Sequence, residues 1–122
     1  MKYLLMIYFD PDTWDTLSEA ERQDVFRGHA DFQQTITESG EMIDTAALAD
    51  TSHTVSVRVR QGVPAVTDGP FVESREYLAG YYLVDCESKE RAAELATMIP
   101  DAKFAALEVR PLMHADGAEV VG

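Results

Sequence analysis

The chain has 122 residues, of which 46% are hydrophobic and 26% are charged, a composition typical of a single globular domain. Its 22 acidic and 10 basic residues give a formal net charge of −12; such a surface repels phosphate backbones and anionic lipids, which disfavours nucleic-acid and membrane functions. The one cysteine, Cys86, excludes an intrachain disulfide, and we expect a cytoplasmic protein because no stretch approaches the ~20 apolar residues of a membrane span.

The N-terminal segment, residues 2–9, reads KYLLMIYF and is apolar at nearly every position. A run this short, rich in aromatic and branched residues, is typical of a strand buried on both faces. We expect it to end at Asp10-Pro11-Asp12, which interrupts the apolar pattern.

The next predicted element is a long helix. Ser18 with Glu21 three residues later forms a capping box, and Gly40 is a left-handed C-terminal stop. The predicted buried stripe has spacings of 0, 4, 7 and 11 residues, which places its members on one narrow helical face. These residues are Val25, His29, Phe32 and Ile36.

A strand and a hairpin are predicted next. Residues 41–47 favour a strand, and residues 54–60 alternate between valines on one face and serine or arginine on the other. Gln61-Gly62 is a turn signal, so residues 63–67 are expected to return as the hairpin partner. Pro64 lacks an N–H and therefore favours a strand edge or the first position of the strand.

The second half of the chain begins with TDGPFVESRE, residues 67–76, a turn followed by alternating charges. Residues 78–84 are again apolar on both faces and predict a second central strand. Ser88 caps a helix that ends before Pro100, and residues 107–110 predict the final strand.

This order of elements predicts an α+β fold. We expect a ferredoxin-like, mostly antiparallel sheet of four to five strands with two helices on one face. One domain is predicted over residues 1–112, with a C-terminal tail over 113–122. Two helices can cover only one face of central strands that are apolar on both faces, so we expect a homodimer in which two sheets pack together.

Three segments resemble a known family: KYLLMIYFD, FRGHADF and TDGPFVESREYLAGYYLVD. Together they are similar to the DGPF-domain branch of the YCII-related proteins over roughly residues 1–112. The resemblance implies a small bacterial protein with a dimeric α+β barrel. It implies little about activity, because the family is largely of unknown function.

The resemblance also suggests a catalytic pair. Some YCII-related proteins use a His on the first helix with an Asp, and His29 matches that His. The family's Asp precedes a Pro after the second helix, where this sequence has Ile99-Pro100. We therefore take Asp68 as the candidate partner of His29. The competing interpretations are a core or interface histidine for His29 and a turn residue for Asp68.

Three further side chains are candidate ligand contacts. Arg58 and Arg75 can neutralise a small anionic ligand, and the planar fork of Arg75 suits a carboxylate. Tyr81 and its neighbour Tyr82 point to opposite faces of the strand, so Tyr81 is a candidate for lining a cavity between the sheet and a partner. Alternatively, Arg75 belongs to a solvated charge cluster with the flanking glutamates.

We expect no metal site and no cofactor. The three histidines lack metal-ligand spacing, and no phosphate-binding loop, dinucleotide fingerprint or nucleophile elbow is found. Three functions stay open. They are a module that binds a small organic or anionic ligand, a cofactor-free lyase or isomerase with His29 as general base, and a regulatory partner of a sigma factor, as the family resemblance implies.

Overall fold

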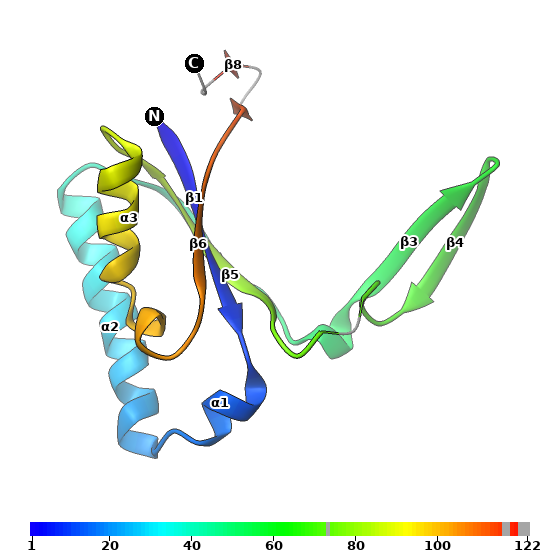
Figure 1. Cartoon of the computed structure of the whole chain (residues 1–122), viewed down its shortest axis with the longest axis horizontal. Helices are drawn as coiled ribbons and strands as arrows, with labels where there is room; N and C mark the ends of the chain where they lie inside the picture. Colours follow the sequence, from blue (N-terminus) through cyan, green and yellow to red (C-terminus); the bar gives the residue numbers. More distant parts are fainter. Residues whose placement is uncertain (73, 116–117, 120–122) are drawn as a thin grey trace.

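The computed structural model describes residues 1–72, 74–115 and 118–119. The domain is built on an antiparallel sheet of four strands in the order β2-β5-β1-β6. The strands are β1 (Lys2–Phe9), β2 (Met42–Ala47), β5 (Tyr77–Asp85) and β6 (Leu107–Pro111). The helices α2 (Glu19–Glu38) and α3 (Lys89–Thr97) lie on one face of this sheet (Figure 1). The predicted ferredoxin-like α+β fold is confirmed.

The boundaries of α2 are set by the predicted caps. The side chain of Ser18 accepts a hydrogen bond from the backbone of Glu21 at 3.1 Å, and the Glu21 carboxylate accepts one from the backbone of Ser18 at 2.9 Å. Gly40 has a φ of +81°, the left-handed conformation that ends a helix. The capping box and the glycine stop are therefore confirmed.

The hydrophobic core lies between the helices and the sheet. Three members of the predicted stripe of α2, Val25, Phe32 and Ile36, are buried. Burying side chains of this size stabilises the fold by roughly 1.5–3 kcal/mol each relative to exposure. The remaining buried hydrophobic residues are Tyr3, Leu5, Ile7, Tyr82, Val84, Cys86, Ala92, Leu95, Ala96 and Ile99.

The opposite face of the sheet, which we call the open face, is not covered by the helices. Along β1, side chains that face the helices are buried and alternate with partly exposed ones. Leu4 and Met6 pair with Leu83 and Tyr81 of β5 on the open face, and all four keep partial solvent exposure. Both long helices pack on the same side, as expected, and the predicted cover of the open face by a second copy stays a prediction.

The predicted hairpin forms as β3 (Val55–Arg60) and β4 (Val63–Asp68). At its turn Gln61 and Gly62 have φ of +49° and +77°, the pattern of the tight turn that matches strand twist. The hairpin is a two-stranded sheet of its own and extends away from the rest of the domain (Figure 1).

Several short elements were not predicted. Asp10-Pro11-Asp12 ends β1 and also starts a short helix. The Asp10 side chain accepts a hydrogen bond from the backbone N–H of Asp12 at 2.9 Å and caps this helix. The short elements are α1 (Pro11–Asp15), η1 (Thr51–His53), η2 (Pro100–Lys103), β7 (His114–Ala115) and β8 (Ala118–Glu119). Within the expected tail, residues 116–117 and 120–122 lie outside the described residues, and the boundary at residue 112 stays a prediction.

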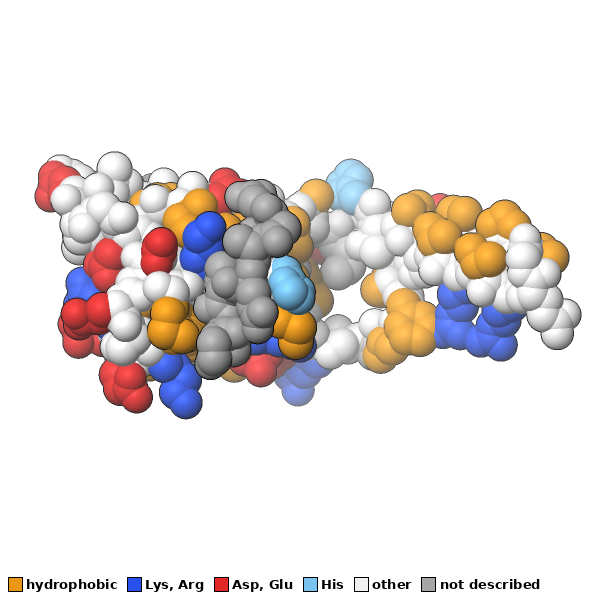
Figure 2. All heavy atoms as spheres, turned by 90° about the horizontal axis from the view of Figure 1, so that it is seen from above, with side chains coloured by type: hydrophobic (Ala, Val, Ile, Leu, Met, Phe, Trp, Pro, Cys, Tyr) orange, Lys and Arg blue, Asp and Glu red, His pale blue; other side chains and the backbone are white. Residues whose placement is uncertain are grey.

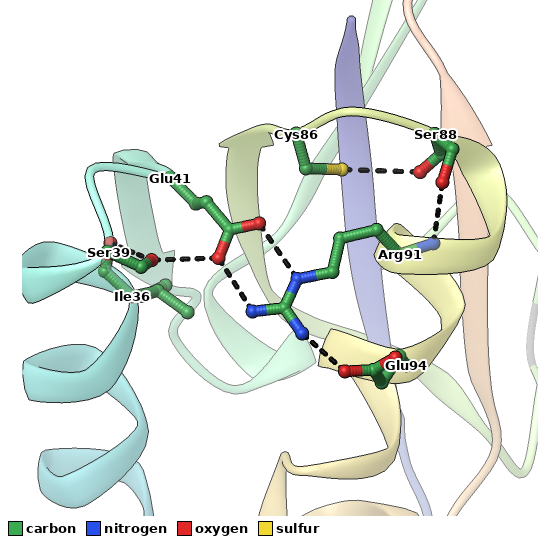
Figure 3. A network of polar contacts seen from close by, with 7 residues as sticks. All are labelled: Ile36, Ser39, Glu41, Cys86, Ser88, Arg91 and Glu94. Carbon is green, nitrogen blue, oxygen red and sulfur yellow. Dashed lines mark hydrogen bonds and ion pairs between the residues drawn. The ribbon is translucent and has the colours of Figure 1, made fainter.

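One ionic network ties α3 to the start of β2 (Figure 3). Arg91 donates to both oxygens of Glu41, at 2.9 and 3.0 Å, and also contacts Glu94. The hydrogen bonds from Arg91 hold the pKa of Glu41 below its ordinary value despite partial burial.

In the described part of the chain, no helix combines the length and the apolar character needed to span a membrane.

Candidate functional site

A cavity of about 540 Å³ opens between α2, α1 and the ends of β1, β2 and β5. Its polar lining is small: His29, Gln33, Thr45, Tyr82 and Asp101 are grouped on one side. The rest of the lining is mainly apolar and consists of Ile7, Phe9, Trp14, Val25, Phe26, Ala46, Ala47, Ala79, Gly80 and Tyr81. An apolar pocket with a few converging polar groups is the usual form of a small-molecule site.

His29 lies at the centre of the polar group and is held at both ring nitrogens. Its Nε2 is 2.5 Å from Oδ1 of Asp101, and its Nδ1 is 2.7 Å from the hydroxyl of Tyr82. The His29 and Asp101 side chains retain 24% and 11% of their exposure, so the pair is partly screened from water yet accessible from the cavity.

Asp101 reaches His29 because of the turn after α3. Pro100 begins η2 and Asp101 follows it, with its backbone oxygen accepting from Phe104 and Ala105. Helix α2 comes close to this turn at Gly28: a Cβ built there would lie 3.0 Å from the Cβ and Cγ of Pro100. The glycine therefore permits the close approach that brings Asp101 onto the ring of the next residue of the helix.

The hydrogen-bonding partners fix the tautomer of His29. A carboxylate can only accept, so the proton between His29 and Asp101 belongs to Nε2 in the neutral imidazole. Nδ1 then accepts from the hydroxyl of Tyr82, whose oxygen accepts from Nε2 of Gln33 at 3.3 Å. Among the described residues, no buried side-chain nitrogen or oxygen lacks a hydrogen-bond partner.

Tyr82 is the second component that the sequence did not single out. Its ring lies parallel to the imidazole of His29 at 5.9 Å and packs edge-on against Phe32 at 4.9 Å. Burial raises the pKa of the Tyr82 hydroxyl, with the negative charge of Asp101 acting in the same direction, whereas the hydrogen bond from Gln33 opposes the rise. The hydroxyl is therefore a proton donor at neutral pH.

The structure brings Asp101, and not Asp68, to His29. Asp68 is an exposed residue at the end of β4, paired with Val55 in the hairpin, and it does not line the cavity. The family's Asp is expected before the proline, where this chain has Ile99, whereas the carboxylate follows Pro100 directly. The Pro-Asp dipeptide after the second helix is the signal that would have identified it.

The two arginines proposed as ligand contacts lie elsewhere. The guanidinium of Arg58 is 4.0 Å from the ring centre of Phe71, and Arg75 pairs with Asp10 and Asp12, at 3.3 Å each. Neither is among the residues that line the His29 cavity. As far as the chain is described, no lysine or arginine lines this cavity, which favours a neutral ligand over an anionic one.

Tyr81 is among the lining residues of this cavity, although it pairs with Met6 on the open face of the sheet; its role as a ligand contact between the sheet and a partner stays a prediction. Its hydroxyl donates to Asp44 at 3.3 Å, on the neighbouring strand. Of the two glutamates in the DGPF stretch, Glu76 is exposed, and Glu73 lies outside the described residues.

The described residues contain no cluster of three or more His, Cys, Asp or Glu side chains placed to hold a metal ion. The cluster of polar side chains around His29 can instead hold a hydrogen-bonding atom of a small organic molecule against Tyr82 and His29. It can also exchange a proton with that molecule, because a carboxylate behind a histidine stabilises the imidazolium that forms.

Comparison with known proteins agrees with the resemblance. The family model of the YCII-related domain matches residues 1–116. An uncharacterized protein of Rhizobium meliloti (strain 1021) is 33% identical over 114 residues, which is 92% of each chain.

Proposed function

This chain belongs to the YCII-related family, and the similar protein of Rhizobium meliloti is uncharacterized. We propose that the protein binds a small neutral organic molecule in the His29 cavity and moves a proton on it. The hydrogen-bonded chain of Asp101, His29 and Tyr82 is the observation that supports this proposal.

The chemistry follows from the tautomer. A C–H next to a carbonyl group of the substrate gives its proton to the oxygen of Tyr82, while the Tyr82 proton moves to Nδ1 of His29. The electron pair of the broken C–H bond passes into the carbonyl as an enolate, and Asp101 stabilises the imidazolium. Returning the proton to another carbon gives an isomerase, and expelling a group from the neighbouring carbon gives a lyase.

The composition of the cavity supports this class of ligand. Its walls are mainly apolar and its volume of about 540 Å³ falls within the range of small-molecule pockets. Trp14 and Phe26, which pack edge to face at 5.9 Å, contribute two aromatic rings to this apolar wall.

The proposal includes a homodimer packed through the open face of the sheet. Partly exposed apolar side chains of β1 and β5 form this face, and both long helices lie on the other side. A second copy of the same face is self-complementary, as two-fold symmetry requires.

The test of the chemistry is hydrogen exchange at carbon. A panel of small neutral ketones and lactones is incubated with the protein in D2O, and loss of the α-proton signal is followed by ¹H NMR. We expect the protein to accelerate exchange of at least one compound. His29→Gln and Asp101→Asn should each reduce that acceleration at least about 100-fold, the usual contribution of general acid–base catalysis.

Two matched variants serve as controls. His53→Gln and Asp31→Asn change an exposed histidine and an exposed aspartate of the same chain and should leave the exchange rate unchanged. Saturation-transfer NMR on the same panel separates the two functions: compounds that bind but do not exchange would overturn the catalytic proposal and leave a ligand-binding module.

A further inference from the structure

The β3–β4 hairpin has one apolar face that no described part of its own chain covers. Cross-strand pairing places Val57 opposite Val66 and Val59 opposite Pro64 on this side. The valines Val55, Val57, Val59 and Val66 are 57%, 62%, 64% and 64% exposed. We call Val55, Val57, Val59, Pro64 and Val66 together the valine face. Figure 2 shows hydrophobic side chains gathered along one side of the hairpin and its arginines along the other.

The opposite face of the hairpin is already occupied at its base by the DGPF stretch. Ser56 donates to the carbonyl of Gly69 at 2.7 Å, and the backbone N–H of Gly69 donates to the carbonyl of Thr54 at 2.7 Å. The ring of Phe71 lies under the guanidinium of Arg58 at 4.0 Å. The stretch therefore braces the arginine side and leaves the valine face bare.

A two-stranded hairpin without a covering layer is at best marginally stable in water. Four exposed valines on a projecting hairpin also form the kind of contiguous apolar patch that marks an interaction surface. We infer that the β3–β4 hairpin is an arm whose valine face packs on a second copy of this chain, which exchanges its own arm in return.

Charge favours a second copy as the occupant. The hairpin from Val55 to Asp68 has two arginines, Arg58 and Arg60, and one carboxylate, Asp68. Of the 10 basic and 22 acidic residues in the whole chain, the remainder therefore holds 8 basic and 21 acidic ones, a net charge of −13. A basic arm is attracted to an acidic body, and this chain supplies both in each copy.

The direction of the arm is consistent with this arrangement. Figure 1 shows the hairpin extending on the side of the sheet away from α2 and α3, which is the side of the open face. A second copy seated on the open face therefore lies on the side toward which the arm extends. Two arms related by a two-fold axis satisfy each other, so the assembly closes at two chains. The inference adds the arm to the homodimer proposed above, and each is tested separately.

The experiment compares neighbouring residues on opposite faces of β4. Val66 belongs to the valine face, whereas Ala65 pairs with Arg58 on the other face, and both are exposed in the single chain. Val66→Glu and Ala65→Glu therefore add the same charge at adjacent positions. Dimer dissociation is measured by analytical ultracentrifugation from about 0.1 to 100 μM, a range that brackets ordinary homodimer affinities. Circular dichroism verifies that each variant is folded.

We expect the unmodified protein to be a dimer. Val66→Glu should weaken dimerisation at least about tenfold, while Ala65→Glu changes it little. In a mixture of isotope-labelled and unlabelled protein, intermolecular NOEs should reach the methyl groups of Val57 and Val66. A dimer with wild-type affinity in Val66→Glu and no such NOEs would overturn the arm and leave a dimer formed by the open face alone. A monomeric wild-type protein would overturn both and assign the valine face to a different partner.

Discussion

Gly28 and Pro100 are in such close contact that the helix has room for no side chain between them: a Cβ at Gly28 would lie 3.0 Å from the Cβ and the Cγ of Pro100. The contact joins the middle of α2 to the first residue of η2. Since His29 and Asp101 are the next residues of these two segments, the contact sets the distance between the two partners of the proposed catalytic pair.

Gly28→Ala should separate that pair. Overpacking costs about 1–3 kcal/mol, and the gain in helix propensity of about 1 kcal/mol offsets only part of it, so we expect a net loss near 1 kcal/mol in the free energy of unfolding. The ¹⁵N shifts of His29 should also change, because Nε2 loses its close contact with Asp101. A variant with unchanged His29 shifts would show that Pro100 yields without moving Asp101.

The tautomer of His29 is testable directly. We expect ¹⁵N NMR of the neutral protein to show the proton on Nε2, because this nitrogen faces the Asp101 carboxylate while Nδ1 faces the Tyr82 hydroxyl. A proton on Nδ1 in the neutral ring would contradict the direction of proton movement that we propose.

Tyr82→Phe and Tyr81→Phe form a matched pair of deletions. Removing the Tyr82 hydroxyl leaves Nδ1 of His29 and the amide of Gln33 without their partner, at a cost of about 1–3 kcal/mol per group left unpaired in the interior. Removing the Tyr81 hydroxyl breaks one exposed hydrogen bond to Asp44 and should change stability by no more than about 0.5 kcal/mol. Urea unfolding measures both, and equal losses would refute the role given to Tyr82.

The network of Glu41 and Arg91 predicts an acid-dependent loss of stability. The pKa of Glu41 lies below its ordinary value of 4.5, chiefly because of the hydrogen bonds from Arg91. The stability that this shift contributes is fully present above the ordinary pKa and is lost as the pH falls through the lower pKa of the folded protein. Thermal unfolding between pH 2 and pH 7 should therefore show a steeper acid-side decrease in the wild-type Tm than in Glu41→Gln.

The Gln variant should itself melt lower than the wild type at pH 7, since Arg91 then loses a charged partner. Glu38→Gln, an exposed residue near the end of α2, is the control. Parallel Tm profiles for Glu41→Gln and the wild type would exclude a contribution from this pair.

Gly80→Ala should disturb the wall of the cavity. A Cβ at this position would lie 2.8 Å from the carbonyl oxygen of Ala46 on the neighbouring strand, so β2 must shift or lose pairing with β5. We expect a loss of about 1–3 kcal/mol, seen in urea unfolding, together with faster amide exchange in β2. Unchanged exchange rates in β2 would show that the strand adjusts without losing its hydrogen bonds.

The sequence predicted the elements that depend on local patterns. The capping box of Ser18 and Glu21, the glycine stop and the turn at Gln61-Gly62 all form as expected, because capping and turn geometry involve residues a few positions apart. The order of strands and helices was then enough for the ferredoxin-like fold, since few topologies connect such elements with short loops.

The partner of His29 was beyond the sequence for a physical reason. His29 and Asp101 are 72 positions apart, and only the close packing of α2 against the η2 turn brings them together. Asp68 had the same chemistry and a stronger local signal, yet it lies on the exposed hairpin. Residue type indicates which chemistry is available, whereas tertiary packing decides which groups meet.

In the DGPF stretch, too, local sequence determined one part of the structure and tertiary packing determined the other. Its composition determined a tight turn: Gly69 has the positive φ of +92° that its position after β4 requires. The sequence also determined the two long helices, the strands of the main sheet and the hairpin, and the His29 stripe, because hydrophobic periodicity and capping are local properties. Only the tertiary structure decided that the hairpin stands apart from the sheet, that Phe71 braces its arginine side, and that Asp101 rather than Asp68 faces His29. These outcomes depend on how distant segments share space, which no local pattern encodes.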